Sequence, residues 1–443
     1  MKNKYSAAVC TLGCRVNQYE SDCIISGFIN AGFEIKDFSD AGCSVYVINT
    51  CTVTAGSDKK SKQMIRRAKR LNPDALVAVC GCFSQSRPEL FKSELQADIV
   101  LGTPGKTKIV DLALDILDGA PIKNPPYISV KNIGEYKEYE NISAEFSEKT
   151  RAYIKIQDGC EAACSYCIIP QVRGCEKSRG YADIYAEAKR FERAGCHELV
   201  LAGIEVSGYG RDLENTDLAD LLERLNNEPG LHNIKSIRLG SIDPSVLKKD
   251  FVDRIANLQK AANHLHLSLQ SGSTRILNLM RRRYNAEQAA ANIGYAKSKI
   301  DGLNLTADII VGFPGETDGD FEKTVELIKN LNIYHAHVFA YSKRRGTDAA
   351  GFDAQVPENI KNARSKILAQ VCGQIKAGIH SQNIGREFEV IIEDSHNGFY
   401  TAKTRNFMDA RVAAQACGGS LRGAMRTVKI TNWDTDFLYG QIL

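Results

Sequence analysis

The sequence predicts an α/β protein built from three parts, on the basis of two repeated patterns and one change of pattern. Buried-strand runs alternate with helix patterns through residues 1–120, which is typical of a parallel α/β domain. After a proline-containing and then acidic linker over residues 121–145, the alternation resumes and predicts a central, partial TIM-type (β/α)6 barrel over residues 146–377. Residues 378–443 change to β-patterned runs, which predict a small OB-like β-barrel.

The bulk composition is that of an ordinary globular protein, with 443 residues, 43% hydrophobic and 25% charged. A net charge of +4 permits a polyanionic partner without requiring one. No apolar run reaches membrane-spanning length, and the first residues lack the apolar core of a signal peptide. We therefore expect a cytoplasmic protein with no membrane partner. In that compartment, fourteen cysteines favour metal binding or catalysis over disulfides.

The first part is predicted to be a parallel sheet with a helix after each strand. Its predicted strands cover residues 5–12, 44–49, 75–80 and 98–102, and its predicted helices lie near 16–31, 56–71, 86–95 and 106–118.

Three cysteines of this part, Cys14, Cys51 and Cys82, each lie just past the carboxyl end of a predicted strand. Ligand sites of open α/β sheets form at those ends, so three thiols distant in sequence can converge there. Core or surface cysteines in ordinary turns remain the alternative. Cys80 competes with Cys82 as the third ligand; Cys82 is preferred because Cys80 should still lie in the strand, whereas Gly81 begins the turn.

The central part contains six candidate strands separated by helix patterns. A TIM-type barrel carries its active site at the carboxyl ends of its strands, so the loops that follow them are candidate site loops. The predicted strands cover residues 152–156, 197–202, 236–240, 264–269, 305–311 and 335–341.

The loop after the first of these strands reads Asp-Gly-Cys-Glu-Ala-Ala-Cys-Ser-Tyr-Cys and holds Cys160, Cys164 and Cys167. Three thiolates from one short loop can hold three corners of a [4Fe-4S] cluster and leave one iron open to a ligand. A structural zinc site would need a fourth ligand. Three unrelated buried cysteines are the other alternative, disfavoured because such cysteines scatter along a chain.

This spacing, with Tyr166 just before the last cysteine, resembles the signature of the radical S-adenosylmethionine (SAM) enzymes. The resemblance implies that the open iron binds SAM and that one electron cleaves SAM to a 5′-deoxyadenosyl radical.

Three motifs of the first part extend the resemblance to the methylthiotransferases, a branch of the radical SAM enzymes. They are Thr-Leu-Gly-Cys ending at Cys14, Asn-Thr-Cys-Thr-Val-Thr around Cys51, and Gly-Cys-Phe-Ser-Gln around Cys82. The resemblance implies that these cysteines hold a second [4Fe-4S] cluster tied to the inserted sulfur. The additional Cys80 departs from the usual pattern.

The other strand ends of the central part carry polar or glycine-rich turns, each of which alone is more typical of a turn than of a ligand site. Together they resemble the SAM-binding strand ends of the methylthiotransferases. On that basis the predicted SAM contacts, besides Tyr166, are Gly203, Glu205, Ser241, Gln270 and Asp308.

Basic residues gather in residues 59–70, which carry seven Lys or Arg and no acid. Such a run is either a solvated helix face or a phosphate-contacting surface; the lack of acids within it favours the second. Two further basic clusters lie at residues 281–283 and 343–345. A surface arginine cluster is often only a solubilising feature, but both clusters resemble family motifs, and the resemblance implies binding of a phosphate-rich substrate. The predicted RNA contacts are Lys59, Lys60, Lys62, Arg66, Arg67, Arg282 and Arg344.

The last part begins after a long amphipathic helix predicted near 357–383 and contains β-patterned runs at 386–394, 398–405, 424–433 and 437–443. It resembles the small β-barrel (TRAM) domain that contacts RNA in this family. Its acidic and basic residues are equal in number, so charge does not support that role.

Within the family, the motifs are most similar to the branch acting on threonylcarbamoyladenosine in tRNA. The resemblance implies methylthiolation at C2 of that nucleoside beside the anticodon, with SAM, two [4Fe-4S] clusters, a flavodoxin- or ferredoxin-like reductant protein and a sulfur donor. Isopentenyladenosine in tRNA and an aspartate of a ribosomal protein remain open as substrates. A non-catalytic, metal-containing RNA-binding protein is the distant alternative. No acid–base catalytic residue is predicted, and cysteines 10, 23, 43, 80, 175, 196, 372 and 417 receive no role.

Overall fold

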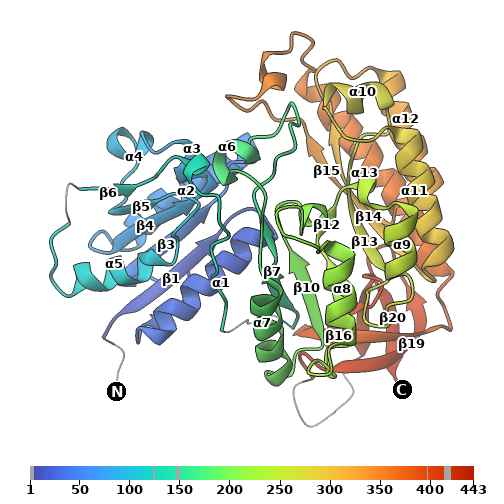
Figure 1. Ribbon diagram of the computed structural model, residues 1–443, viewed down its shortest axis with the longest axis horizontal. Helices are drawn as coiled ribbons and strands as arrows, with labels where there is room; N and C mark the ends of the chain where they lie inside the picture. Colours follow the sequence, from blue (N-terminus) through green and yellow to red (C-terminus); the bar gives the residue numbers. More distant parts are fainter. Residues whose placement is uncertain (1–3, 123–124, 146–149, 397, 414–420) are drawn as a thin grey trace. The chain divides into compact units, whose positions relative to one another are not determined.

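The computed structural model describes residues 4–122, 125–145, 150–396, 398–413 and 421–443. The chain forms two compact units and passes between them more than once (Figure 1). The first unit comprises Met1–Ser147, Gln157–Arg179 and Ser342–Ala350. The second comprises Glu148–Ile156, Gly180–Tyr341 and Gly351–Leu443. The cysteine loop of the central part therefore belongs to the same unit as the amino-terminal sheet. The domain limits given above stay a prediction.

The first unit is built on a six-stranded parallel sheet in the order β2-β1-β3-β4-β5-β6, which confirms the predicted parallel α/β fold. Strands β3 and β4 are buried along their whole length, as expected for a sheet covered on both faces. The strands are β1 (Ser6–Thr11), β2 (Glu34–Ile35), β3 (Val45–Thr50), β4 (Leu76–Gly81), β5 (Ile99–Leu101) and β6 (Tyr127–Ser129).

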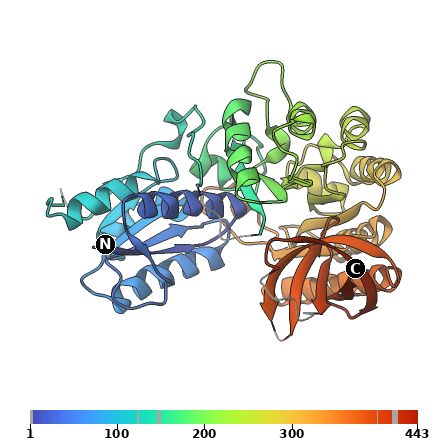
Figure 2. The same ribbon diagram turned by 90° about the horizontal axis from the view of Figure 1, so that it is seen from below.

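Helices cover both faces of this sheet (Figure 2). On one face α1 (Arg15–Asn30) and α5 (Lys108–Leu117) pack against the sheet through an apolar cluster that includes Phe28 and Ile109. On the other face α2 (Ala55–Leu71) does so through Ile65. The single helix predicted near 86–95 is wrong in detail. Residues there form α3 (Cys82–Ser86) and α4 (Leu90–Ser93), because Pro88 interrupts the helical hydrogen bonding between them.

Part of the range predicted as linker is ordered against the sheet. Strand β6 pairs in parallel with β5, and a 3-10 turn, η1 (Ile133–Glu135), follows it. The short apolar stretch Tyr-Ile-Ser completes the edge of the sheet, a role that its proline-rich and acidic surroundings hid. Residues 123–124 of this range lie outside the described residues.

The second unit contains all six predicted central strands, in two parallel sheets ordered β7-β10-β11 and β12-β13-β14-β15. Strands β11 and β12 are consecutive in the chain and separated by Gly240, so the six predicted strands and their partial barrel are confirmed. The bounds are β7 (Ala152–Lys155), β10 (Glu198–Ala202), β11 (Ser236–Leu239), β12 (Ser241–Ile242), β13 (His264–Gln270), β14 (Asn304–Val311) and β15 (His335–Ala340).

Helices separate these strands in the chain, and several begin at side chains that satisfy the first free backbone N–H groups. Asp217, Asn285 and Thr317 each form a capping box at the start of α8, α11 and α12. The helices are α7 (Tyr181–Arg193), α8 (Leu218–Asn227), α9 (Lys249–Ile255), α10 (Thr274–Leu279), α11 (Ala286–Lys299), α12 (Asp318–Leu331) and α13 (Glu358–Ser381), with 3-10 turns η2 (Val206–Gly208), η3 (Pro244–Val246) and η4 (Asp348–Gly351).

The carboxyl-terminal residues form a closed five-stranded barrel ordered β16-β17-β18-β20-β19, as predicted. Its core is apolar and includes Val390, Ile392 and Val428. The fifth strand, β18, did not stand out as a separate run because it is short. The strands are β16 (Glu387–His396), β17 (Phe399–Thr404), β18 (Asp409–Ala413), β19 (Met425–Trp433) and β20 (Leu438–Ile442).

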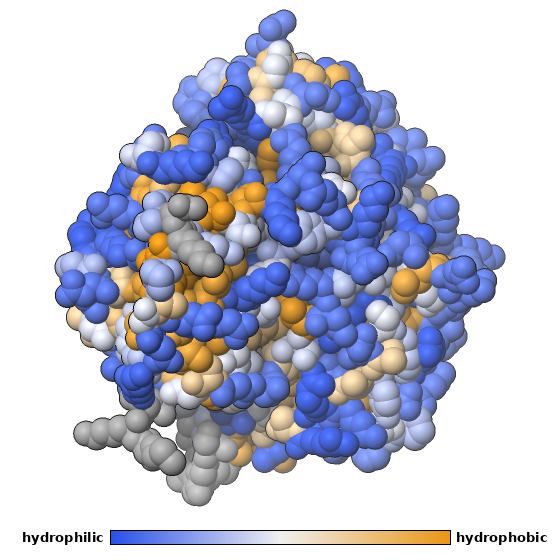
Figure 3. Space-filling view, turned by 60° about the vertical axis from the view of Figure 1, so that its left-hand side comes forward, coloured by the Kyte–Doolittle hydropathy of each residue, from blue (hydrophilic) through white to orange (hydrophobic). Residues whose placement is uncertain are grey.

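The face of the molecule seen in Figure 3 is largely hydrophilic, with smaller apolar areas. Among the helices of the described residues, none combines the length and apolarity needed to cross a membrane.

Candidate functional site

The structure places Cys14, Cys51 and Cys82 at the carboxyl ends of β1, β3 and β4, which are adjacent in the sheet. Cys14 is the residue before α1, Cys51 directly follows β3, and Cys82 begins α3. The turns are closely packed: a β-carbon at Gly13, which has a φ of +96°, would lie 2.7 Å from both the Cβ and the Sγ of Cys51. The three positions that the sequence singled out therefore meet at one sheet edge.

The thiols of this set lie close enough for the ionisation of one to oppose that of a neighbour. Burial raises the pKa of Cys51 to about 11, with the neighbouring Cys82 and Cys14 thiols adding to the rise. Thiols that oppose each other's ionisation in this way become a good ligand set once a cation is present, because the metal stabilises the thiolates.

Cys80 differs from Cys82 in its surroundings. Cys80 lies inside β4 and belongs to the apolar cluster under α1 and α5, with a side chain that is completely buried. Burial raises the pKa of its thiol to about 12. Cys82 instead lies past the strand end, in contact with Ile168 and Val172. This arrangement favours Cys82 as the third thiol of the set and a core role for Cys80.

The second set of thiols, Cys160, Cys164 and Cys167, lies in a loop closed by a short antiparallel pair, β8 (Gln157–Asp158) and β9 (Lys177–Ser178). The Cys160 N–H donates to the carbonyl of Gly174 at 3.0 Å, and the Cys167 N–H donates to the carbonyl of Cys164 at 3.1 Å. The loop needs glycine at its base.

Gly159 has a φ of +72°, and a β-carbon there would lie 1.8 Å from the Cys175 carbonyl oxygen. Cys160 is buried, while Cys164 and Cys167 are half-buried. Three thiols in one loop fit a cluster with one open iron.

The two sets of thiols meet within the first unit. Cys82 packs against Ile168, the residue after Cys167, and against Val172 of α6 (Ile169–Arg173). The Thr103 hydroxyl, after β5, donates to the Val172 carbonyl at 2.6 Å. The cysteine loop is thus held against the strand ends that carry the other three thiols.

A buried polar network lies behind this contact. The Arg173 guanidinium donates to Glu20 Oε1 at 2.6 Å and to Asn17 Oδ1 at 2.5 Å, and it also contacts Asp158 at 3.2 Å. Lys106 Nζ binds Glu20 as well and donates to Asn49 Oδ1 at 3.0 Å. Glu20, Arg173 and Lys106 are each at most 2% exposed. Charges this deeply buried are stable only when paired.

The network also reaches the thiols. Burial raises the pKa of Cys82, and the positive charges of Arg173 and Lys106 oppose that rise. Sequence reasoning missed this network because its members come from five separate segments, and Glu20, Lys106 and Arg173, which carry most of its charge, belong to none of the quoted motifs.

The predicted SAM contacts are distributed over both units. Tyr166 is half-buried in the cysteine loop of the first unit. Gly203, Glu205, Ser241 and Gln270 follow or end strands of the second unit. Burial raises the pKa of Glu205, with Asp243 adding to this effect and Arg282 opposing it.

Gln270 has a φ of +60° at the irregular end of β13. A non-glycine residue in this conformation is uncommon and often marks a functional turn.

Asp308 lies inside β14 rather than at its end. Its Oδ1 atom is 3.2 Å from His266 Nε2 and 3.3 Å from His337 Nδ1. Burial alone would raise the pKa of Asp308, but hydrogen bonds from the two imidazoles outweigh it and hold the pKa at about 2. Sequence reasoning missed both histidines. The available signal was the repeated His-x-His pattern, at 264–266 and 335–337.

The basic run forms most of α2 and turns one charged face to solvent. Lys59, Lys60, Arg66 and Arg67 are exposed, whereas Lys62 is half-buried and pairs with Glu94 at 3.1 Å.

The other two predicted RNA contacts, Arg282 and Arg344, are buried and paired with carboxylates of the protein. Arg282 is paired with Asp243 at 2.6 Å, and Arg344 binds Asp58 at 2.6 Å and the Thr52 hydroxyl at 2.8 Å. Their burial argues against direct contact with a phosphate. Arg344 instead fastens the 342–350 segment to the turn after Cys51.

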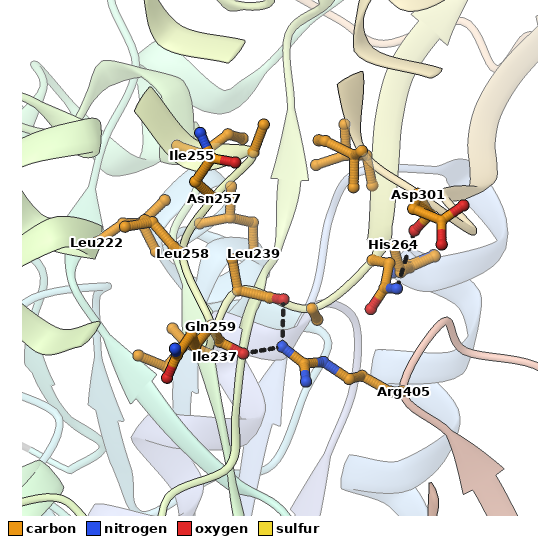
Figure 4. Close-up of a pocket in the computed structure, with 16 residues that line it drawn as sticks. Leu222, Ile237, Leu239, Ile255, Asn257, Leu258, Gln259, His264, Asp301 and Arg405 are labelled. Carbon is orange, nitrogen blue, oxygen red and sulfur yellow. Dashed lines mark hydrogen bonds between the residues drawn. The ribbon is translucent and has the colours of Figure 1, made fainter. Parts of the chain in front are cut away.

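One cavity of about 280 Å³ lies at the amino ends of β11 and β13 in the second unit (Figure 4). Arg405 enters it from the carboxyl-terminal barrel and donates to the carbonyls of Gln259 and Ala261, the latter at 2.9 Å. Active sites of TIM-type barrels lie at the opposite, carboxyl ends of the strands. We therefore assign the cavity to the contact between the central barrel and the carboxyl-terminal β-barrel, and not to the reaction site.

Comparison with known proteins agrees with this arrangement. The radical SAM superfamily matches residues 154–328, and the family described as uncharacterized protein family UPF0004 matches residues 6–102. Among solved structures, the radical SAM methyltransferase TsrM from Kitasatospora setae aligns with a TM-score of 0.54 at 15% identity, covering 77% of this chain and 75% of that one. This likeness confirms the fold.

The chain belongs to the radical SAM methylthiotransferase family. The threonylcarbamoyladenosine tRNA methylthiotransferase MtaB of Bacillus subtilis is 39% identical over 90% of this chain and 88% of the relative. The protein of the same name from Aquifex aeolicus is 35% identical over 90% of this chain and 95% of the relative. The tRNA-2-methylthio-N(6)-dimethylallyladenosine synthase of Acetivibrio thermocellus is 33% identical over 98% and 90%. The protein is thus an enzyme that uses SAM and a [4Fe-4S] cluster, which sets aside the non-catalytic alternative.

Proposed function

We propose that this enzyme inserts a methylthio group at C2 of threonylcarbamoyladenosine in tRNA, next to the anticodon. Two relatives at 39% and 35% identity carry that activity in their names. The observation that carries the proposal is the meeting of the two thiol sets in one compact unit, through Cys82, Ile168 and Val172. An aryl C–H bond is too inert for side-chain acid–base chemistry. A radical source can remove the hydrogen atom from this C–H bond, and a sulfur source held close to it can then supply sulfur to the carbon.

We assign the [4Fe-4S] cluster that binds SAM to Cys160, Cys164 and Cys167, and a second [4Fe-4S] cluster to Cys14, Cys51 and Cys82. When bound, the first supplies the electron that cleaves SAM and the second supplies sulfur. The chain's own contribution is positional and electrostatic. Arg173 and Lys106 place positive charge beside Cys82, which stabilises a thiolate-ligated cluster.

The remaining proposed contacts are those with SAM, at the strand ends, and those with tRNA, on the basic helix. We assign SAM contacts to Gly203, Glu205, Ser241 and Gln270, and Tyr166 stays a predicted contact beside Cys167. The exposed face of α2 is the proposed surface for tRNA phosphates, with Lys59 and Lys60 at its start. A small reductant protein of the flavodoxin or ferredoxin kind would deliver the electron. A sulfur donor would restore the sulfur that leaves with the product.

Nucleoside mass spectrometry of tRNA from a deletion strain tests the proposal. We expect the methylthio form of threonylcarbamoyladenosine to disappear and its unmethylthiolated precursor to accumulate, and the wild-type gene to restore it. Persistence of the methylthio nucleoside in a strain with no paralogue would refute the assignment.

The same digest separates the related substrates. Loss of the methylthio form of dimethylallyladenosine instead would assign the activity named for the Acetivibrio relative. Unchanged tRNA together with loss of a methylthio-aspartate from a ribosomal protein would assign the third substrate.

A further inference from the structure

One face of strands β13, β14 and β15 carries mostly polar side chains, whereas the opposite face is apolar. Along these strands, buried apolar residues such as Leu267, Ala307 and Ile309 alternate with histidines, a threonine and an aspartate. Four of the eight histidines in the chain lie here. The polar residues of this face include His264, His266, Ser268, Asn304, Thr306, Asp308, His335 and His337.

Three of these side chains converge. The Asp308 carboxylate lies between His266 and His337, at 3.2 and 3.3 Å. His266 is held from its other ring nitrogen, since Nδ1 lies 2.7 Å from the Thr306 hydroxyl. Both ring nitrogens of His266 are thus engaged, which fixes its orientation and that of Asp308. The groups that face a ligand are the second ring nitrogen of His337 and the second oxygen of Asp308.

The face is covered at the amino end of β13 and exposed along β15. At the amino end of β13, His264 is buried and stacks on Phe407 of the carboxyl-terminal barrel, with ring centroids 4.5 Å apart. On β15, His335 is exposed, the His337 side chain is 53% exposed, and Phe339 on the same face is 45% exposed. Phe339 lies two residues beyond His337, nearer the carboxyl end of β15, and pairs with Ile310 of β14.

An exposed aromatic ring beside a convergent polar group is a binding surface for a planar, polar ligand. The threonylcarbamoyl substituent offers matching groups: a hydroxyl that can donate to the second ring nitrogen of His337, and ureido N–H groups that can donate to the Asp308 carboxylate. A dimethylallyl chain has none of them and would leave Asp308 without a partner in the ligand, which is costly in a desolvated site.

We propose that His266, Asp308, His337 and Phe339 form the subsite that binds the threonylcarbamoyl substituent and selects it over an apolar one. This inference rests on the proposed function. The low pKa of Asp308 keeps the carboxylate ionised and available as an acceptor. The alternative occupant is a divalent metal ion, because the three ligand atoms lie within 4.8 Å of one another. A metal would not account for the exposure of Phe339, which favours the nucleoside.

The test uses the full chain, reconstituted without oxygen, and three synthetic anticodon stem-loops. These carry threonylcarbamoyladenosine, adenosine or dimethylallyladenosine at the same position. We expect the wild type to bind the threonylcarbamoyl stem-loop at least about tenfold more tightly than the adenosine stem-loop. His337→Leu and Asp308→Asn should each remove most of this preference and change affinity for the adenosine stem-loop by less than about twofold.

His232→Leu is the matched control, because His232 is exposed on another loop of the same unit and should leave the preference unchanged. Circular dichroism of each variant checks folding, and Asp308→Asn preserves the shape of the side chain. Wild-type preference in both subsite variants would overturn the inference. So would zinc or iron that copurifies with the wild type beyond the cluster iron and is absent from Asp308→Asn.

Failure of the proposed function gives a different result. In that case the wild type itself would show no preference for the threonylcarbamoyl stem-loop and no methylthio product from it, before any variant is compared.

Discussion

The two sets of thiols in the first unit are built in opposite ways. Cys160, Cys164 and Cys167 come from one loop, whose shape is fixed locally by the β8–β9 pair and by Gly159. Cys14, Cys51 and Cys82 come from three turns that only the parallel sheet brings together. The loop set depends on a few local hydrogen bonds, whereas the sheet set depends on the folding of the whole unit. The two sets should therefore respond differently to substitution.

The largest expected effect separates the two sets by activity. Cys164→Ala should lower 5′-deoxyadenosine formation from SAM by at least about a thousandfold, because the cluster that delivers the electron loses a ligand. Cys51→Ala should stop methylthio product while 5′-deoxyadenosine still forms within a few-fold of wild type. Chromatography of both products measures this. Equal loss of 5′-deoxyadenosine in Cys51→Ala would show that the two sets do not act independently.

The next effect concerns the third ligand of the sheet set. Cys82→Ala should lower the iron content of the reconstituted protein from about eight to about four per chain, because one of two four-iron clusters loses a thiolate. Cys80→Ala is the matched control two residues away and should keep all of the iron, since Cys80 is packed in the core. Iron and sulfide assays give the answer. Loss of iron in Cys80→Ala and not in Cys82→Ala would show that Cys80 is the third ligand.

A third prediction probes the buried network that joins the segments of both sets. Glu20→Gln removes the carboxylate shared by Arg173 and Lys106 and leaves buried positive charge. It should lower the free energy of unfolding of this unit by about 3–5 kcal/mol. Glu94→Gln, which removes the partner of half-buried Lys62, should cost at most about 1 kcal/mol. Urea unfolding followed by circular dichroism compares the two, and similar midpoints would contradict the assignment.

The smallest effect is expected on the surface beside the sheet set. Replacing Lys59 and Lys60 together by Gln should weaken tRNA binding by roughly tenfold near physiological salt and reduce the salt dependence of log affinity by about 1–2 units. Lys92→Gln and Lys108→Gln, which lie outside α2, serve as a control of equal charge change. Filter binding at several salt concentrations measures both slopes. If the control pair has the same effect, the contribution of α2 is only net charge.

Much of the fold could be read from periodicity. The strands of the central part and the parallel sheet of the first part were predicted within a few residues, because apolar runs of strand length alternate with amphipathic helices. Some short strands were not predicted, namely β2, β6 and β18, because their few residues lie among turn-forming or polar residues. The helix expected near 86–95 is divided at Pro88, because proline removes a backbone N–H donor and disfavours a helix interior.

The sequence by itself determined which thiols belong together in the loop, because their spacing is local and a chain of a few residues allows few arrangements. It also indicated that three strand-end cysteines could meet, since parallel strands share one carboxyl edge. Only the tertiary structure decided that Cys80 lies in the core and that Glu20 pairs with both Arg173 and Lys106. It alone placed His337 beside Asp308. Such contacts join residues far apart in the chain, and the burial and pairing of each depend on neighbours that no local pattern encodes.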